Sequence, residues 1–322
     1  MSIFRSTIWF VKGLKEYTKS GFTSASKSFR AEDLSVDISG WSYMITGANS
    51  GLGKATALAL AKKGGTVHLV CRNQERGEAA KTEITETTGN QNVFMHQLDT
   101  SRPAEVYSFV KRFESSGQSL DVLINNAGCM VNTRELTEEG LEKNFATNTL
   151  GTHILTTALM PLLAKSQQPR VIIVSSGGML TQSLNTDDLQ FERMRKFDGT
   201  VAYAQNKRQQ IVMCEQYAKQ FPNVHFSTMH PGWADTPAVQ TSMPDFHAKM
   251  QSRLRSVEEG ADTIIWLAIS EVALKQPTGL FFQDRKAVST HLPLAFTKST
   301  IQQDTKLIDS VEEIAAKFKP AE

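Results

Sequence analysis

Hydrophobic residues alternate along the chain between short, continuous apolar runs and longer segments in which they recur with the period of a helix. Two of the short runs, at residues 122–125 and 170–174, are almost wholly apolar, which is typical of parallel strands covered on both faces. The alternation predicts βαβ units around a parallel sheet. We expect strands at residues 43–46, 66–71, 92–97, 122–125, 170–174, 225–229 and 280–282, and helices at 54–63, 104–114, 140–164, 204–219 and 257–270.

No break in composition divides residues 40–285, so we expect a single domain there. An N-terminal arm at residues 1–39 and a polar C-terminal tail at residues 286–322 would flank it. The chain has 322 residues, of which 40% are hydrophobic and 21% charged, and this excludes a disordered or fibrous protein. The formal charge of +2 argues against nucleic acid as a partner.

Three cysteines, Cys71, Cys129 and Cys214, match no metal-binding pattern and are too few for a disulfide framework. We therefore expect no metal site and an intracellular, reducing compartment. No apolar run approaches the ~18 residues that span a bilayer. The sequence thus predicts a cytoplasmic protein or one attached peripherally to a membrane.

The N-terminal arm concentrates positive charge, because residues 1–30 contain six basic residues and one acid, Glu16. As a helix, the arm would gather its apolar residues on one side: Ile3, Phe4, Phe10, Val11, Leu14 and Tyr17. Such a basic amphipathic helix can bind a membrane surface through residues 1–20. It can equally pack on the protein's own surface or on a second copy in a homo-oligomer.

A glycine-rich turn follows the first predicted strand directly and opens a helix-forming segment. A turn of this kind lets the backbone approach a ligand closely and points the free N–H groups of a helix N-terminus at a pyrophosphate. An ordinary tight turn between a strand and a helix is the alternative. The candidate phosphate-binding residues are Gly47, Asn49, Ser50, Gly51, Leu52 and Gly53.

Tyr203 and Lys207 lie four residues apart in a predicted helix, so they share one face about 6 Å apart. A carbonyl that accepts a hydride needs a proton donor, and a nearby ammonium lowers the pKa of a phenol and makes it a better donor. The same spacing occurs by chance in many helices. The spacing indicates a catalytic pair here because of its position in the chain, downstream of Ser175-Ser176 at the end of a predicted strand.

Taken in order, these motifs resemble the short-chain dehydrogenase/reductase family over about residues 40–285. The glycines have the family spacing G-x-x-x-G-x-G, Asn125-Asn126-Ala127-Gly128 matches its N-N-A-G element, and residues 231–236 match P-G-x-x-x-T. The resemblance implies a doubly wound, Rossmann-type α/β fold. The family makes Tyr203, Lys207, Ser176 and Asn148 catalytic, with Ser176 also holding the substrate carbonyl and Asn148 holding a water linked to the lysine.

The remaining residues implied by the resemblance bind a nicotinamide cofactor: Arg72, Asp99, Asn126, Ala127, Gly128, Tyr203, Lys207, Pro231, Gly232 and Thr236. Arg72 stands where NAD-dependent proteins carry an acid for the ribose, and an arginine there suits a 2′-phosphate. We therefore favour NADP(H), with NAD(H) as the alternative. Asn148 also has a simpler interpretation, as a hydrogen-bonded amide in an apolar helix. His230 we interpret as structural.

The leading hypothesis is an oxidoreductase that transfers a hydride between the cofactor and a carbonyl or alcohol. A catalytically silent cofactor-binding scaffold or sensor is its main rival, and an epimerase or dehydratase is a weaker one. Ser176 and Tyr203 stand 27 positions apart, about twice the usual family spacing, and this lengthening resembles the retinol-dehydrogenase-like branch. The small-molecule substrate, which we expect to be lipophilic, would contact residues 177–202 and 238–255.

Overall fold

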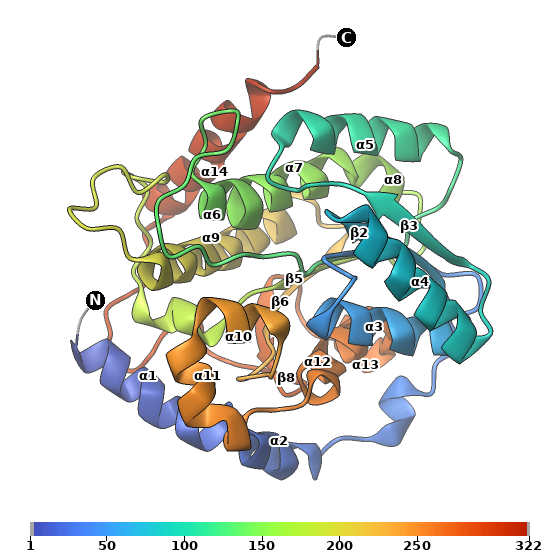
Figure 1. The fold of residues 1–322 in the computed structure, drawn as a ribbon, viewed down its shortest axis with the longest axis horizontal. Helices are drawn as coiled ribbons and strands as arrows, with labels where there is room; N and C mark the ends of the chain where they lie inside the picture. Colours follow the sequence, from blue (N-terminus) through green and yellow to red (C-terminus); the bar gives the residue numbers. More distant parts are fainter. Residues whose placement is uncertain (1–2, 321–322) are drawn as a thin grey trace.

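The computed structural model describes residues 3–320, which form one eight-stranded sheet with helices on both faces (Figure 1). The strand order is β3-β2-β1-β4-β5-β6-β7-β8, and all pairs are parallel except β7 with β8. The strands are β1 (Ser42–Thr46), β2 (Thr66–Cys71), β3 (Val93–Gln97), β4 (Val122–Asn125), β5 (Arg170–Val174), β6 (His225–His230), β7 (Leu280–Gln283) and β8 (Lys286–Ala287). This doubly wound sheet confirms the predicted fold class, with one short antiparallel strand more than expected.

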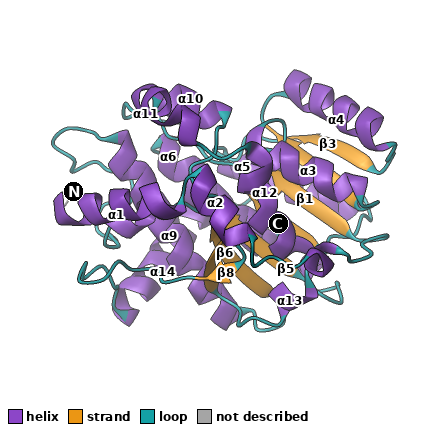
Figure 2. Cartoon of the chain, turned by 90° about the horizontal axis from the view of Figure 1, so that it is seen from below, coloured by secondary structure: helices purple, strands orange, loops and turns teal. Residues whose placement is uncertain are grey.

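Two helical layers cover the sheet, as the side view shows (Figure 2). Side chains alternate along each strand, so Met44 of β1 joins one core while Tyr43 and Ile45 join the other. The first core contains α5 (Pro103–Ser115), α7 (Gly151–Ala158), α9 (Gly199–Gln220) and α14 (Ile301–Ala316). The second contains α3 (Gly51–Lys62), α4 (Gln74–Thr88), α12 (Val257–Ile269) and α13 (Glu271–Leu274).

The single helix predicted at residues 140–164 is broken in the structure. It consists of α6 (Lys143–Phe145), a π-helix (Ala146–Leu150), α7 and α8 (Met160–Leu163). Pro161 in the first turn of α8 lacks the N–H that a continuous helix needs. Single π-helical turns often occur at functional sites, and this one carries Asn148.

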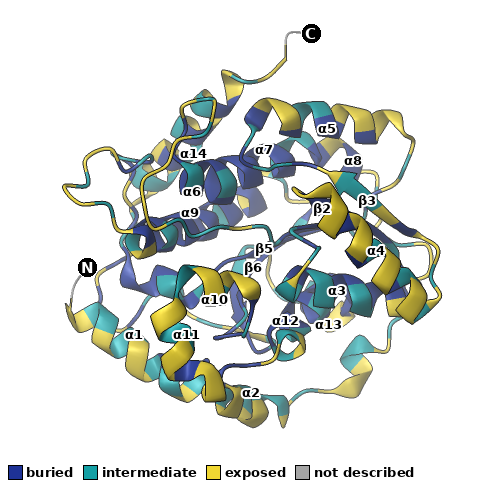
Figure 3. Cartoon of the chain, in the orientation of Figure 1, coloured by how far each residue is buried: buried dark blue, intermediate teal, exposed yellow. Residues whose placement is uncertain are grey.

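The segment expected as a polar tail, residues 286–322, carries β8 and the long helix α14. A capping box of Thr300 and Gln303 starts α14. Leu307, Val311 and Ala315 follow at intervals of four residues and are fully buried. Ile308 and Ile314 are partly buried against the same core, so the segment carries an amphipathic helix instead of the tail that we expected. Figure 3 shows buried and exposed colouring along this helix.

The N-terminal arm is helical and packs on the domain. It forms α1 (Ile3–Glu16), α2 (Lys19–Ser26) and the short 3-10 helix η1 (Ala31–Leu34). Gly13 and Tyr17 are buried against Trp233, whose ring would lie 2.3 Å from a β-carbon at Gly13. Packing on the protein's own surface therefore accounts for the inner side of α1. No helix within residues 3–320 is long and apolar enough to cross a membrane.

Candidate active site

The motif residues gather at the carboxyl ends of the parallel strands. The strand order reverses between β1 and β4, whose helices leave to opposite faces, and ligands of doubly wound folds bind in the crevice outside this point. The glycine turn follows β1, the N-N-A-G element follows β4, Ser176 follows β5 and Pro231 follows β6. The fold thus brings together motifs that the sequence spreads over more than half of the chain.

The glycine turn has the form of a phosphate cradle. Gly47 and Gly51 have left-handed backbones, with φ of 65° and 52°. A β-carbon at Gly53 would lie 2.5 Å from the Gly47 carbonyl oxygen, so only glycine allows this close approach. Ser50 precedes α3 without capping it by its side chain, and the first turn holds no acid. The N–H groups and positive dipole end of α3 are therefore available to an anion such as a pyrophosphate.

Asn126 fixes the turn from the next strand of the sheet. Its amide Nδ2 donates to the carbonyl oxygens of Thr46 and Gly47, at 2.9 and 3.3 Å. The N–H groups of Asn126 and Ala127 donate to the Thr46 hydroxyl, at 3.0 and 2.9 Å. These contacts hold the two predicted cofactor segments against each other.

Thr236 lies on the other side of the glycine turn. It caps α10 (Pro237–Ser242) by accepting from the Val239 N–H, at 3.3 Å. Its Cβ would lie 3.5 Å from a β-carbon at Gly51. Leu52 is partly buried and contacts Gly260 at the start of α12. The P-G-x-x-x-T segment is therefore in contact with the glycine turn. Asn49, within the turn, is partly buried.

Arg72 and Asp99 lie together at the ends of β2 and β3. Asp99 Oδ1 accepts from the N–H and hydroxyl of Ser101, at 2.9 and 2.7 Å, and Asp99 Oδ2 faces Arg72 Nε at 4.0 Å. The Arg72 side chain is 63% exposed, so this weak ion pair leaves the guanidinium accessible to an anionic ligand.

Tyr203 and Lys207 project from one face of α9 beside Ser176. The Lys207 ammonium lies over the Tyr203 ring, 5.3 Å from its centroid. Lys207 Nζ donates to the Val174 carbonyl oxygen at 2.8 Å, and the Ser175 hydroxyl donates to the Lys207 carbonyl oxygen at 3.0 Å. Both bonds attach α9 to the end of β5, so the helix and the strand fix the position of the lysine.

The two functional groups have shifted pKa values in this site. Burial raises the pKa of Tyr203 to about 12, and the Cys129 thiol adds to this, while the Ser176 hydroxyl interacts with the phenol and lowers it. Burial lowers the pKa of Lys207 to about 7. We expected Lys207 to lower the pKa of Tyr203. Burial outweighs any such effect, because the same burial lowers the pKa of Lys207 and so makes the lysine only partly charged at neutral pH.

Asn148 is held in place on both sides of its amide. Its Oδ1 accepts from the Cys129 N–H at 2.9 Å, and its Nδ2 donates to the Cys129 carbonyl oxygen at 2.8 Å. The same Nδ2 lies 3.2 Å from Asn206 Oδ1. A β-carbon at Gly128, which precedes Cys129, would lie 3.2 Å from Asn148 Oδ1, so a side chain there would push against the Asn148 amide.

Gln210 is a site residue that the sequence reasoning missed. Its Oε1 accepts from Lys207 Nζ at 3.1 Å, and its Nε2 donates to the Asn148 carbonyl oxygen at 2.7 Å. The family resemblance has Asn148 hold a water that links Lys207 to solvent, and the Gln210 amide adds a direct connection between Lys207 and Asn148. The available signal was its spacing, because a residue three positions after Lys207 lies on the same helical face.

His230 supports the segment that follows Ser176. Its Nδ1 accepts from the Gly177 N–H at 2.9 Å, and its ring packs edge-on against Tyr17 of the arm, with centroids 4.3 Å apart. Burial and the charge of Arg255 keep the pKa of His230 well below its usual value. The imidazole is therefore neutral and holds the wall of the site.

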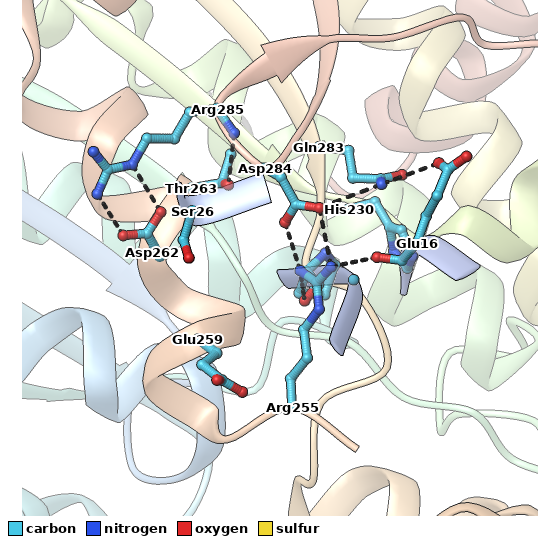
Figure 4. A network of polar contacts seen from close by, with 12 residues as sticks. Glu16, Ser26, His230, Arg255, Glu259, Asp262, Thr263, Gln283, Asp284 and Arg285 are labelled. Atoms are coloured by element: carbon cyan, nitrogen blue, oxygen red, sulfur yellow. Dashed lines mark hydrogen bonds and ion pairs between the residues drawn. The ribbon is translucent and has the colours of Figure 1, made fainter. Parts of the chain in front are cut away.

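Arg255 joins the arm to the domain beside the site (Figure 4). Its guanidinium makes two bonds to Asp284, at 2.6 and 3.0 Å, and donates to the carbonyl oxygens of Glu16 and Thr18 at 2.6 and 3.3 Å. A β-carbon at Gly232 would lie 2.3 Å from Arg255 Nε. We call this set of contacts the arginine clamp. No sequence motif marks the arginine clamp, because its members are far apart in the chain.

The two segments that we expect to contact the substrate contain several short helices. Residues 177–202 begin with the 3-10 helix η3 (Gly177–Thr181), and residues 238–255 include α10, α11 (Pro244–Met250) and the short 3-10 helix η4 (Gln251–Arg253). The Asn132 amide, from the loop after β4, donates to the Ser242 carbonyl oxygen of α10 at 2.9 Å. This bond links two segments that border the site.

Comparison with known proteins gives the family. A family model described as short chain dehydrogenase matches residues 42–186. Human dehydrogenase/reductase SDR family member 12 is 60% identical over 319 residues, which cover 99% of this chain and 100% of that protein. Human retinol dehydrogenase 11 is 33% identical over 253 residues, 77% of this chain and 79% of that protein.

Solved structures agree on the fold. A protein of uncharacterised function from Mycobacterium paratuberculosis superposes with a TM-score of 0.69 and 27% identity, covering 87% of this chain and 95% of that one. A short chain dehydrogenase from Shigella flexneri, solved with NADP, gives a TM-score of 0.62 at 23% identity, over 78% of this chain and 99% of that one. Motifs, fold and relatives agree, and the chain belongs to the short-chain dehydrogenase/reductase family of NAD(P)-dependent oxidoreductases.

Proposed function

We propose that this protein transfers a hydride between a nicotinamide cofactor and a carbonyl or alcohol, with Tyr203 as the proton donor and acceptor. The proposal is supported by two observations: Lys207 lies over the Tyr203 ring with the Ser176 hydroxyl interacting with the phenol, and the first turn of α3, which follows the glycine turn, has no acid and no side-chain cap. The bound cofactor supplies the hydride acceptor or donor. All other steps fall to side chains of this chain.

In the reducing direction, the hydroxyls of Ser176 and Tyr203 hold the substrate oxygen. Negative charge develops on that oxygen as the carbonyl carbon is reduced, and hydrogen-bond donors aimed at it stabilise this charge. Tyr203 then gives its phenolic proton to the oxygen. In the oxidising direction the same phenol oxygen takes the proton back.

Lys207 stabilises the charge that Tyr203 carries after proton transfer, because its ammonium lies over the phenol ring. Gln210 Oε1 and the Val174 carbonyl oxygen accept hydrogen bonds from this ammonium and so favour its charged form. Asn148 holds the other end of the Gln210 amide. The four proposed catalytic residues and Gln210 thus form one connected group.

We further propose that the substrate is lipophilic and that the cofactor is NADP(H). Retinol dehydrogenase 11 is named for a lipophilic alcohol. On the substrate side, Trp233, Met250 and Leu254 form an apolar cluster with Tyr17 of the arm. The accessible Arg72 guanidinium suits the 2′-phosphate of NADP(H).

A cofactor-binding scaffold without turnover is the rival function. The purified protein should be titrated with NADPH and NADH by fluorescence, then assayed for cofactor oxidation and reduction with a panel of lipophilic aldehydes, ketones and alcohols. We expect tighter binding of NADPH and turnover of at least one panel member. Binding without any turnover would favour the scaffold, and equal affinity for both cofactors would contradict the role of Arg72.

A further inference from the structure

Helix α1 is apolar on both sides, although only one side packs on the domain. Its inner side, with Trp9, Gly13 and Tyr17, lies against the core. On its outer side Ile3 is 85% and Val11 61% exposed. Large apolar side chains that gather on an exposed surface often mark an interaction site. The outer side of α1 exposes such side chains among its polar residues, as the exposed colouring along its outer edge shows (Figure 3).

A loop from the opposite end of the chain exposes two further apolar side chains. Leu294 is 75% and Phe296 86% exposed, while Leu292 and Ala295 between and beside them are buried. Leu294 and Phe296 both have left-handed backbones, with φ of 56° and 51°. This conformation is unfavourable for residues with a β-carbon. The loop thus holds two large apolar side chains outward in spite of both backbone strain and exposure to water.

The loop and α1 form one surface. Arg5 Nε of α1 donates to the Ala295 carbonyl oxygen at 3.0 Å, between the two exposed side chains. Ile8 and Trp9 of α1 pack against the same buried cluster as Leu292 and Ala295. We call this surface the apolar face, and its exposed members are Ile3, Phe4, Phe10, Val11, Leu294 and Phe296.

The charges around the apolar face are basic. Lys15 is exposed four residues after Val11 on the outer side of α1, and Lys298 is exposed two residues after Phe296. Glu16 is the only acid in residues 3–30, and it is paired with Lys12. Exposed Leu and Phe side chains flanked by lysines are complementary to the surface of an anionic bilayer, whose acyl region takes the apolar groups and whose headgroups attract the cations.

We propose that the apolar face docks the protein on an anionic membrane surface, with Leu294 and Phe296 inserted beside the outer side of α1. Two segments almost 300 positions apart build this face, so a free N-terminal helix is not the binding element. The inference goes beyond the reaction, because none of these six side chains belongs to the catalytic group.

The test is binding of the full-length protein to vesicles of phosphatidylcholine with phosphatidylserine, and to vesicles of phosphatidylcholine alone, measured by flotation. The wild type should bind the anionic vesicles more tightly than the neutral ones. The double variant Leu294→Ser, Phe296→Ser should lose about tenfold or more in affinity, as should Ile3→Ser, Val11→Ser. The double variant Leu136→Ser, Val272→Ser is the matched control, since it removes two exposed apolar side chains outside the face, and it should bind as the wild type does.

Absence of wild-type binding to both vesicles would overturn the proposal, as would unchanged binding by the Leu294→Ser, Phe296→Ser variant. Self-association that disappears in this variant, without any vesicle binding, would also overturn it and assign the face to a second copy. NADPH titration of the same samples keeps this result apart from the proposed function. All four proteins should bind NADPH equally, because every substituted side chain is exposed.

Discussion

The two sides of the candidate site are built from different kinds of contact. On the cofactor side, Gly53, Thr46 and Asn126 bring the ends of β1 and β4 within van der Waals and hydrogen-bond distance, through backbone atoms, the Thr46 hydroxyl and the Asn126 amide. On the substrate side, the arginine clamp joins the arm, the turn at Gly232 and the β7–β8 hairpin through one buried guanidinium.

This difference explains why sequence motifs locate the cofactor side of the site but not the substrate side. The cofactor side needs small residues and amides at fixed spacings within short segments, so it leaves motifs. The substrate side needs one arginine and one aspartate 29 positions apart, together with carbonyl oxygens that any residue can supply. Its stability rests on a few strong contacts, and single substitutions there should have the largest effects.

Arg255→Met breaks the clamp and leaves the Asp284 carboxylate buried without its partner. Removing one member of a buried ion pair costs about 3–5 kcal/mol, so we expect a loss of that size in the free energy of unfolding, measured with urea. Lys306→Met is the control, because its pair with Asp187 is exposed and should contribute less than ~1 kcal/mol. Equal losses in the two variants would show that the clamp does not hold the arm.

Gly53→Ala tests the close packing on the cofactor side. The new β-carbon would lie 2.5 Å from the Gly47 carbonyl oxygen, so α3 must move away from the turn. We expect a destabilisation of about 1–3 kcal/mol and a loss of about tenfold or more in NADPH affinity. Gly178→Ala, whose β-carbon meets only an ordinary contact at 3.5 Å, should leave the NADPH affinity within about twofold. An unchanged affinity in Gly53→Ala would contradict the phosphate cradle.

Arg72→Ala tests the choice of cofactor. Loss of a charge-assisted hydrogen bond costs about 1.5–3 kcal/mol, so NADPH should bind at least about tenfold more weakly while NADH affinity stays the same. Arg76→Ala, four positions further on and also exposed, is the control and should affect neither cofactor. A parallel fall for NADPH and NADH would remove the argument for a 2′-phosphate contact.

Gln210 offers the finest test, because two substitutions should act in opposite directions. Gln210→Leu removes an acceptor from the Lys207 ammonium and lowers the lysine pKa further from its value of about 7, so activity that needs the charged form is lost at lower pH. Gln210→Glu adds a negative charge and should move the alkaline limb to higher pH. Each shift should be about one pH unit in kcat/KM against pH, with NADPH affinity as the control. Shifts of the same sign would indicate a structural role only.

The sequence predicted the core of the fold but not its ends. All seven predicted strands match to within one residue at each end, because fully buried parallel strands need unbroken apolar runs such as residues 171–174. The two elements that were not predicted leave weaker signals in the sequence. β8 spans two residues, and α14 packs through only three fully buried positions.

In the candidate site, the motifs located Tyr203 and Lys207 but not Gln210. A glutamine in the middle of a helix resembles a surface residue until the fold buries it beside the lysine. The packing of the N-terminal arm could not be predicted. The spacing of its apolar residues indicated a helix, but the side of that helix that faces the domain depends on the contact between Gly13 and Trp233, which forms only on folding.

The central claim is that Tyr203 performs the proton transfer, and Tyr203→Phe tests it most directly. With the panel substrate that the wild type turns over best, kcat should fall by about 10²–10⁴-fold, because the ring remains and the proton is lost. NADPH affinity should stay within about twofold of the wild-type value, and the melting temperature should stay within a few degrees of it. A variant that binds NADPH normally and keeps a tenth or more of wild-type kcat would contradict the account.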